Sequence, residues 1–451
     1  MKETTIEYLQ REPAAPSLGW IIFASSSGSL IEWYDFYLFQ TMAVFFGRHF
    51  FPQSVHNGML GVLLSMATLG LGFAIRPLGG LLFGSLGDRI GRKYTFLVTL
   101  LIMGATTTGM GMLPTFEKAG YFAPVILLTL RLLQGLATGG ELGTASTFVA
   151  EHAPERRRGW YTALLGAMSP MGTLMAVGVV YLCRNSMNET TFDDWGWRIP
   201  FLISGVLVFV SLYLRMRMRE TPVFEALLRT RQSANSPIRE LFFKRENRVR
   251  MLLGIFGATA GQSALGITAL AYSLTFMEAV LKVDIATASG AIFIALACGM
   301  PFYLLFGWLS DRIGRRPLII LGGLCAIVFY VPIYAAMKWA ASPPQFWMLA
   351  FLCWLQVLFV GMTIGPTTAF AAELFSARVR TTAISVTMNI SNGLLSGFSM
   401  LIAFSLIAAT GNIYLGLAYP MFLAAITVVV NLFFVKETHQ INIHSEINAQ
   451  S

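Results

Sequence analysis

Long apolar stretches alternate with short polar stretches along the whole chain. Twelve apolar stretches can be marked, at residues 19–46, 58–86, 94–113, 122–148, 159–183, 197–217, 251–279, 286–310, 317–338, 345–372, 382–408 and 413–435. About 20 apolar residues in a helix cross the hydrocarbon core of a bilayer, whereas a strand of a membrane barrel is about half that length and alternates apolar with polar positions. The pattern therefore predicts an all-α polytopic membrane protein with twelve transmembrane helices.

The longest polar stretch follows the sixth apolar stretch and divides the chain into halves. This division predicts a tail at residues 1–18, a six-helix bundle at 19–217, a linker at 218–250, a second six-helix bundle at 251–435 and a tail at 436–451. We expect a short amphipathic helix in the linker near residues 222–231.

A charged, glycine-containing motif occurs once in each half. Residues 84–93 read G-S-L-G-D-R-I-G-R-K, and residues 307–316 read G-W-L-S-D-R-I-G-R-R, so that Asp88 and Asp311 lie 223 positions apart. Glu151 and Glu373, each followed by arginines, are 222 positions apart, and the sixth and twelfth stretches both end in Glu-Thr. Repeats at one common offset indicate a duplicated membrane protein, and charges between two apolar stretches must lie in interfacial turns.

Composition and charge agree with a membrane protein and exclude several other classes. The chain is 55% hydrophobic, its mean hydropathy is +0.64, and only 12% of its residues are charged, against about 25% in soluble domains. With the N-terminus inside, 24 Lys and Arg lie in inner segments and 6 in outer loops. This bias predicts a multi-pass protein of the cytoplasmic (inner) membrane with both termini in the cytoplasm. It also explains the net charge of +9 without nucleic acid.

Other signals for alternative classes are absent from the sequence. The four cysteines are scattered without a C-x-x-C, so neither a disulfide nor a metal site is expected. No catalytic motif of the G-x-S-x-G or H-E-x-x-H type occurs, so the chain is not expected to be an enzyme or to hold a cofactor. Residues 1–17 are polar and precede an apolar run too long for a signal peptide, so we expect none.

Several short motifs lie along both halves of the chain. They are Glu32-Trp-Tyr-Asp35-Phe, Arg76-Pro-Leu-Gly, residues 84–93, Arg131-Leu-Leu-Gln134-Gly, Gly140-Glu141-Leu-Gly, Gly196-Trp-Arg-Ile-Pro-Phe201, Glu220-Thr-Pro and Glu373-Leu-Phe. In these motifs the chain resembles the major facilitator superfamily, and most closely its metabolite:proton symporter family, which includes carriers of citrate, 2-oxoglutarate, shikimate, proline and betaine. The G-P-x-x-G-G signature of drug antiporters is missing from the fifth stretch, which weakens an antiporter interpretation. The resemblance implies alternating access of one site between two six-helix bundles.

Five charged residues lie well inside the apolar stretches of the first half, away from their ends. An ionised side chain at mid-membrane costs roughly 2.5–3.5 kcal/mol even on lenient scales, so each needs a partner or a function. Glu32 and Asp35 share one helical face, and the spacing of Arg131, Gln134, Thr138 and Glu141 makes one polar stripe. We predict a proton-coupling group of Asp35, Arg131, Glu32 and Glu141, in which the resemblance pairs Asp35 with Arg131. The alternative is a set of structural ion pairs that join helices.

The second half carries no such charges, but neutral polar residues recur at helical spacing. The clearest set is Ser385, Asn389, Asn392 and Ser396 in the eleventh stretch. Such groups either bind a polar solute or join helices by hydrogen bonds. The predicted substrate-binding residues are Arg76, Gln134, Tyr34, Gln262, Asn389 and Asn392.

The repeated motifs also have a mechanical interpretation. Arg92 with Glu151, and Arg315 with Glu373, can pair at the inner ends of adjacent helices, and a carboxylate such as Asp88 favours a helix N-terminus. By resemblance, such pairs hold an inner gate shut, whereas the alternative is that the basic residues only set orientation. The predicted gating residues are Gly84, Asp88, Arg89, Gly91, Arg92, Glu151, Asp311, Arg312, Arg315, Glu373 and Arg380.

Together these features predict a proton-coupled symporter of a small polar metabolite, which acts as a monomer with the lipid bilayer, protons and its substrate as partners. Arg76 and Arg131 favour an organic acid. The alternatives are an osmolyte (proline or betaine) symporter and an uncoupled facilitative carrier or exchanger. Channel and sensor interpretations are weaker, because the membrane acids suit coupling and the polar ends are too short for a signalling domain.

Overall fold

Helices make up almost all of the structure, a computed structural model that describes residues 18–52, 59–230, 234 and 236–443. Eleven helical stretches of the described chain are long and apolar enough to cross a membrane. The twelfth helix, α2 (Leu18–Thr41), carries Glu32 and Asp35 and packs between two of the eleven, α9 and α11. The predicted fold of twelve membrane helices is therefore confirmed. Most of the predicted N-terminal tail and part of the C-terminal tail lie outside the described residues.

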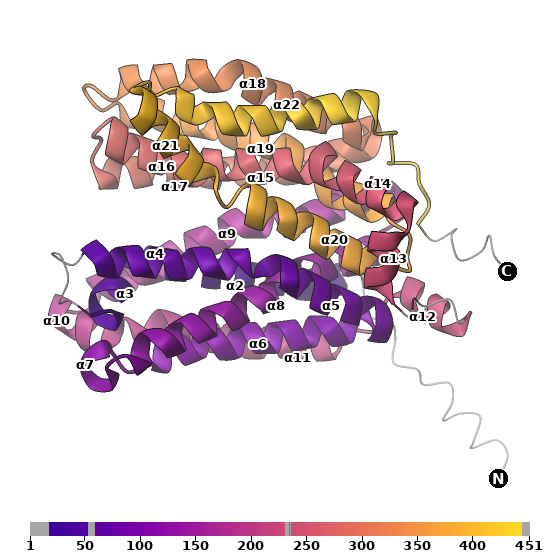
Figure 1. Cartoon of the computed structure of the whole chain (residues 1–451), viewed down its shortest axis with the longest axis horizontal. Helices are drawn as coiled ribbons and strands as arrows, with labels where there is room; N and C mark the ends of the chain where they lie inside the picture. The colour runs from indigo at the N-terminus through magenta and orange to yellow at the C-terminus, as the bar shows by residue number, and fades with distance from the viewer. Residues whose placement is uncertain (1–17, 53–58, 231–233, 235, 444–451) are drawn as a thin grey trace, which may run out of the picture.

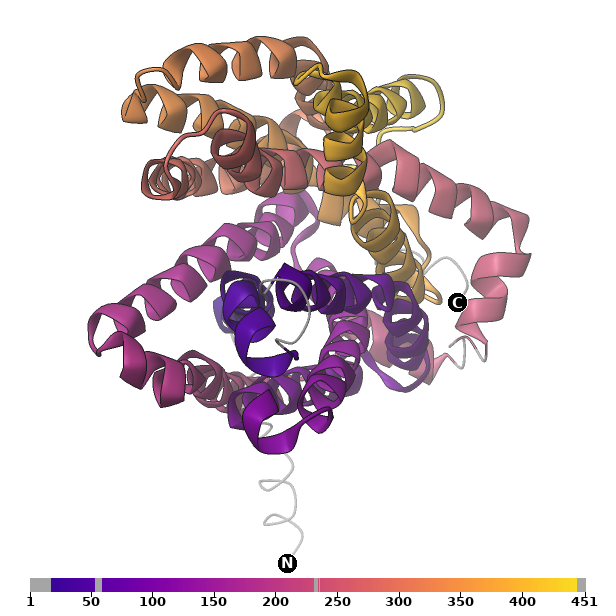
Figure 2. The ribbon, with the colours of Figure 1, turned by 60° about the vertical axis from the view of Figure 1, so that its left-hand side comes forward.

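Two bundles lie one above the other in Figures 1 and 2. The first bundle contains α2, α3 (Ala43–Phe50), α4 (Met59–Ala74), α5 (Arg76–Ile90), α6 (Arg92–Met112), α8 (Phe122–His152), α9 (Arg158–Asn185) and α11 (Arg198–Met216). The second contains α14 (Arg245–Gly254), α15 (Ala260–Ile267), α16 (Ser273–Thr275), α17 (Ile285–Ile313), α18 (Arg315–Ala340), α19 (Phe346–Leu374), α20 (Arg380–Asn389), α21 (Ser399–Thr410) and α22 (Ala418–Phe433).

The bundles meet along a few helices only. In the first bundle α5 and α8 pack against α20, and α9 packs against α17 and α19. The same pattern is visible in Figure 1, where α9 and α20 lie between the two layers. We call the end that holds residues 84–93 and 307–316 the motif end. The linker helices α12 (Pro222–Arg229) and α13 (Pro237–Phe243) lie at this end, on the right of Figure 1.

Helix boundaries differ from the predicted ones at several places. The first apolar stretch is two helices, because α2 ends at Thr41 and α3 begins at Ala43. Helix α14 begins at Arg245, inside the predicted linker, and the amphipathic linker helix is α12. The eleventh stretch is interrupted after Asn389 by a π-helical turn at Ile390–Leu395, so α20 and α21 are separate.

The two cores differ in side-chain type. The core of the second bundle is rich in alanine and tyrosine, and small residues let membrane helices approach closely. The first bundle packs phenylalanines and a tryptophan at the end opposite the motif end, where Phe45, Phe46, Phe50, Trp197 and Phe201 lie ring against ring. This packing supports the helices that carry the charged residues described below.

Candidate functional site

Tight turns at Gly91 and Gly314 connect α5 to α6 and α17 to α18. Both glycines have positive φ, 121° and 103°, which side-chain-bearing residues rarely adopt. A Cβ on Gly91 would lie 2.3 Å from the carboxylate of Glu220, and one on Gly314 would lie 2.5 Å from that of Glu437. The glycine that follows Asp-Arg-Ile in each motif is thus required by both backbone conformation and a neighbouring carboxylate.

The motif aspartates reach across to the other bundle. Asp88 accepts hydrogen bonds from the backbone N–H groups of Thr381 (3.1 Å) and Thr382 (2.8 Å) and from the Thr382 hydroxyl (2.7 Å), at the start of α20. Asp311 accepts from the N–H groups of Gly159 (2.8 Å) and Trp160 (2.9 Å), at the start of α9. Free N–H groups and the helix dipole stabilise a carboxylate at a helix N-terminus. Each bundle therefore caps one helix of the other.

Buried ion pairs lie beside both aspartates. Glu151 contacts Arg92 (3.5 Å) and Arg380 of the other bundle (2.9 Å), and it accepts a hydrogen bond from Thr221 (2.6 Å). We call Asp88, Arg92, Glu151, Thr221 and Arg380 the first gate cluster. The expected pair of Arg92 with Glu151 is present.

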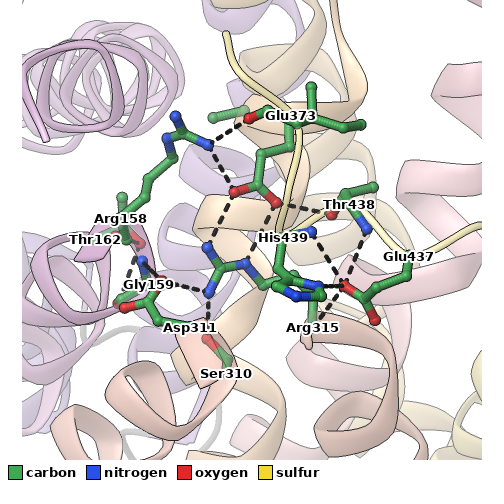
Figure 3. A network of polar contacts seen from close by, with 12 residues as sticks. Arg158, Gly159, Thr162, Ser310, Asp311, Arg315, Glu373, Glu437, Thr438 and His439 are labelled. Atoms are coloured by element: carbon green, nitrogen blue, oxygen red, sulfur yellow. Dashed lines mark hydrogen bonds and ion pairs between the residues drawn. The ribbon is translucent and has the colours of Figure 1, made fainter. Parts of the chain in front are cut away.

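The second copy repeats this arrangement, as Figure 3 shows. Glu373 contacts Arg315 (3.0 Å) and Arg158 of the other bundle (2.8 Å), and it accepts from Thr438 (2.7 Å). We call Arg158, Asp311, Arg315, Glu373 and Thr438 the second gate cluster. Sequence reasoning predicted neither Arg158 nor the two threonines, although both threonines were visible as the repeated Glu-Thr after the sixth and twelfth stretches.

The first glycine of each motif permits the bundles to touch. A Cβ on Gly84 would lie 2.8 Å from the Cα of Thr382, and one on Gly307 would lie 2.6 Å from the carbonyl oxygen of Gly159. Both contacts are backbone of the opposite bundle, so a larger residue would push the bundles apart. Two predicted gating residues lie elsewhere: Arg89 and Arg312 are exposed, and Arg312 stacks on Trp308 at 3.9 Å.

Two glutamates outside the membrane helices hold the motif turns. Burial opposes ionisation of Glu437, but backbone N–H groups of Arg315, Arg316, Thr438 and His439, at 2.8–3.1 Å, outweigh it and keep its pKa below the ordinary value. Among the described residues, Glu220 accepts from two backbone groups, the N–H groups of Lys93 (3.1 Å) and Thr221 (2.8 Å). Burial therefore dominates and raises the pKa of Glu220.

In the middle of the first bundle, a chain of hydrogen bonds links Arg131 to Asp35. The Arg131 guanidinium donates to Gln134 Oε1, Gln134 Nε2 donates to the Thr107 hydroxyl (2.7 Å), and that hydroxyl donates to Asp35 Oδ2 (2.7 Å). All four side chains are buried. No direct ion pair joins Asp35 and Arg131 among the contacts of the described residues, so the predicted pair is bridged by Gln134 and Thr107.

A separate buried ion pair involves Glu141. Its carboxylate accepts from Arg215 Nη2 (2.6 Å) and from the Thr99 hydroxyl (2.6 Å), and the Arg215 guanidinium lies 3.3 Å from the centre of the Phe96 ring. Sequence reasoning gave no role to Arg215 at the end of the sixth apolar stretch, whereas the structure shows it buried in the last turn of α11. The contacts of Glu141 fit the structural alternative that the sequence left open.

Four residues predicted for proton coupling or substrate binding line a small cavity in the first bundle. These are Glu32, Arg76, Arg131 and Gln134, with Thr138, Phe36 and Phe73 beside them, around a cavity of about 10 Å³. The Arg76 guanidinium lies 4.3 Å from the Phe73 ring centre. Arg76 Nε and Glu32 Oε2 are buried and lack a hydrogen-bond partner among the described residues. The cavity thus presents both signs of charge with unused hydrogen-bonding capacity.

The other predicted substrate-binding residues do not line this cavity. Tyr34 donates to the carbonyl of Pro200 (2.7 Å), Asn389 donates to the carbonyl of Gly139 in the other bundle (2.7 Å), and Asn392 accepts from Ser263. Gln262 is half-buried. Their roles in binding remain predictions.

Two family models match large parts of the chain. A model described as Major Facilitator Superfamily matches residues 26–332, and one described as Sugar (and other) transporter matches residues 224–448. The chain is 34% identical to an alpha-ketoglutarate permease of Escherichia coli (strain K12) over 86% of this chain and 87% of the relative. It is 32% identical to a proline/betaine transporter of the same strain, over 92% of this chain and 83% of the relative. The solved structure of a proton:xylose symporter, XylE, has a TM-score of 0.80 at 18% identity, over 96% of this chain and 98% of that chain.

Proposed function

Because the chain belongs to the Major Facilitator Superfamily, whose members are transporters rather than enzymes, we propose that it is a proton-coupled symporter of a small organic acid. The observation that carries this proposal is the cavity of the first bundle, where two arginines and a glutamate meet inside an apolar bundle. Charges at this depth are costly unless they are used or paired. Arg76 and Arg131 suit a carboxylate, in keeping with the alpha-ketoglutarate permease among the relatives.

A zwitterionic osmolyte is the second candidate substrate. Glu32 lines the same cavity as Arg76, so an ammonium group and a carboxylate would both find an opposite charge. The proline/betaine transporter among the relatives supports this alternative. A thermal-shift screen of the purified protein against organic acids, amino acids and betaines separates the two, because a bound ligand stabilises the folded state.

We place the motif end in the cytoplasm, since 24 of 32 Lys and Arg lie in segments on that side. In this orientation the two gate clusters close the cytoplasmic side, and the structure corresponds to a carrier closed to the cytoplasm. A single cysteine at Ser236, in the linker, should react with an impermeant reagent only after cells are permeabilised. Labelling of intact cells would reverse the orientation.

The proton carrier in this proposal is Asp35. Arg131 does not release a proton at ordinary pH, so the acid of the linked pair must do so. Asp35→Asn should abolish uphill accumulation but retain substrate exchange, because the neutral amide resembles the protonated acid. The measurement is uptake against a gradient, and exchange with preloaded substrate, in proteoliposomes. Normal accumulation with ordinary pH dependence would exclude Asp35 and make Glu32 the next candidate.

A further inference from the structure

The Thr107 side chain lies between Asp35 and the pair Arg131 and Gln134, which line the cavity. Among the described residues, it is the only side chain that bonds both to Asp35 and to this pair. Its hydroxyl donates to Asp35 Oδ2 and accepts from Gln134 Nε2, each at 2.7 Å. Gln134 Oε1 in turn accepts from Arg131, and both of these residues line the cavity. Every donor in this series of hydrogen bonds therefore points from the cavity toward Asp35.

The direction of these bonds depends on the charge of Asp35. A hydroxyl has one hydrogen to donate, and the ionised carboxylate only accepts, so Thr107 must donate to Asp35 when Asp35 is charged. A hydrogen bond to a charged acceptor is roughly twice as strong as one between neutral groups. When Asp35 takes a proton from water, an O–H bond forms on the carboxyl group and the negative charge is lost. The Thr107 bond is then weakened, or it reverses so that Asp35 donates.

Other charged groups surround this series of hydrogen bonds but do not contact Asp35 directly. The titratable and charged side chains on the helices packed around it are Glu32 and Tyr34 of α2, Arg76 of α5, Arg131 and Glu141 of α8, Cys183 of α9 and Arg215 of α11. Of these, Glu141 and Arg215 neutralise each other at 2.6 Å. Helix α6 contributes no charge here, and its contribution is the Thr107 hydroxyl.

We infer that Thr107 is a positioning residue that couples protonation of Asp35 to the placement of Arg131 and Gln134 in the cavity. With Asp35 ionised, the chain of bonds holds the Gln134 amide on Thr107 and the Arg131 guanidinium on Gln134. With Asp35 protonated, Thr107 can turn its hydroxyl away, and Gln134 and Arg131 are released toward the substrate. This inference rests on the proposed proton symport and names the residue through which proton and substrate communicate.

The test replaces Thr107 with valine, which keeps the shape but removes the hydroxyl. Thr107→Val should lower the steady-state accumulation ratio about tenfold or more, a loss expected for one charge-assisted hydrogen bond. Substrate exchange between preloaded and external pools should persist, and exchange should lose its dependence on pH. Thr107→Ser, which restores the hydroxyl, should recover accumulation and pH dependence.

Thr106 provides a matched control in the same helix turn. It is buried, and its hydroxyl donates only to carbonyls of its own helix, at Ile102 (2.9 Å) and Met103 (2.8 Å). Thr106→Val should therefore leave accumulation unchanged. If Thr107→Val inserts poorly, Thr107→Ala carries the same expectation with a smaller side chain.

The outcomes separate this inference from the proposed function when Asp35→Asn is measured in parallel. Loss of accumulation in Asp35→Asn together with normal accumulation and pH dependence in Thr107→Val would overturn the role of Thr107 and leave proton symport through Asp35 in place. Equal loss in Thr107→Val and Thr107→Ser would assign the effect to packing of the methyl group and would also overturn the inference. Normal accumulation in Asp35→Asn would instead contradict the proposed function itself.

Discussion

The two halves of the chain match contact for contact at the motif end, whereas their centres hold different chemistry. Each gate cluster has an aspartate on a helix N-terminus of the other bundle, a glutamate between two arginines, and a threonine from the segment that follows the sixth or twelfth membrane helix. The centre of the first bundle holds Asp35, Arg131 and Glu32. The interior of the second bundle holds instead the neutral network of Ser273, Tyr334 and Gln356.

This difference indicates which parts of the proposed mechanism need both halves. In that mechanism closure is made by contacts across the interface, so both bundles must supply a matching surface, and the motif occurs in both. The proposed proton coupling needs a buried ionisable group, which is costly in a membrane, so a single set in one bundle is enough. Neutral groups that satisfy each other, such as Tyr334 and Gln356 at 3.2 Å, stabilise the second bundle without that cost.

The largest effect expected from this comparison concerns the charged centre. If the substrate is an anion, Arg76→Gln should weaken its binding roughly 10- to 100-fold, because a hydrogen bond to a charged group contributes about 1.5–3 kcal/mol. Asn389→Ala should change affinity little, since that amide is used on the carbonyls of Gly139 and Ser385. Titration calorimetry with the ligand found by the screen measures both. An unchanged affinity in Arg76→Gln would move Arg76 to a structural role and count against the organic-acid proposal.

A smaller effect is expected when each gate cluster is weakened in turn. Asp88→Asn and Asp311→Asn remove the charge at the starts of α20 and α9, respectively, and each should slow uptake several-fold while the protein stays folded and inserted. Asp88 should have the larger effect, because its side chain is completely buried and that of Asp311 is 5% exposed. Initial uptake rates, normalised to the amount of inserted protein, test this order. Normal uptake in both variants would leave the motifs with a role in orientation only.

Much of this architecture could be predicted from the sequence, because its signals are periodic or repeated. Apolar length predicts the twelve helices, and the common offset of Asp88 and Asp311 predicts the duplication. Pairings between distant residues could not be predicted in the same way. Arg215 stands at the end of an apolar stretch beside other arginines, and nothing local distinguishes it from solvent-exposed neighbours. Its partner Glu141 lies on another helix, so only the packing of α8 against α11 and α6 reveals the pair.

The smallest expected effect concerns Glu220 and Glu437, which hold matching turns but differ in their hydrogen bonds. The pKa of Glu437 lies below its ordinary value, so the stability that this carboxylate contributes is present at neutral pH and is lost as the pH falls through that lowered pKa. Glu437→Gln should therefore lower the melting temperature by a few degrees at pH 7, and the difference from the unmodified protein should begin to shrink toward pH 4.

Burial raises the pKa of Glu220, so the ionised carboxylate destabilises the fold at neutral pH. This penalty falls as the carboxyl group becomes protonated at lower pH. Glu220→Gln should leave the melting temperature at pH 7 unchanged or slightly higher, since one amide oxygen can still accept from the N–H groups of Lys93 and Thr221. Thermal unfolding of both variants between pH 4 and pH 8 measures the contrast. Equal losses in the two variants at pH 7 would show that the turns are supported alike, and the difference between the two halves would then be confined to the bundle centres.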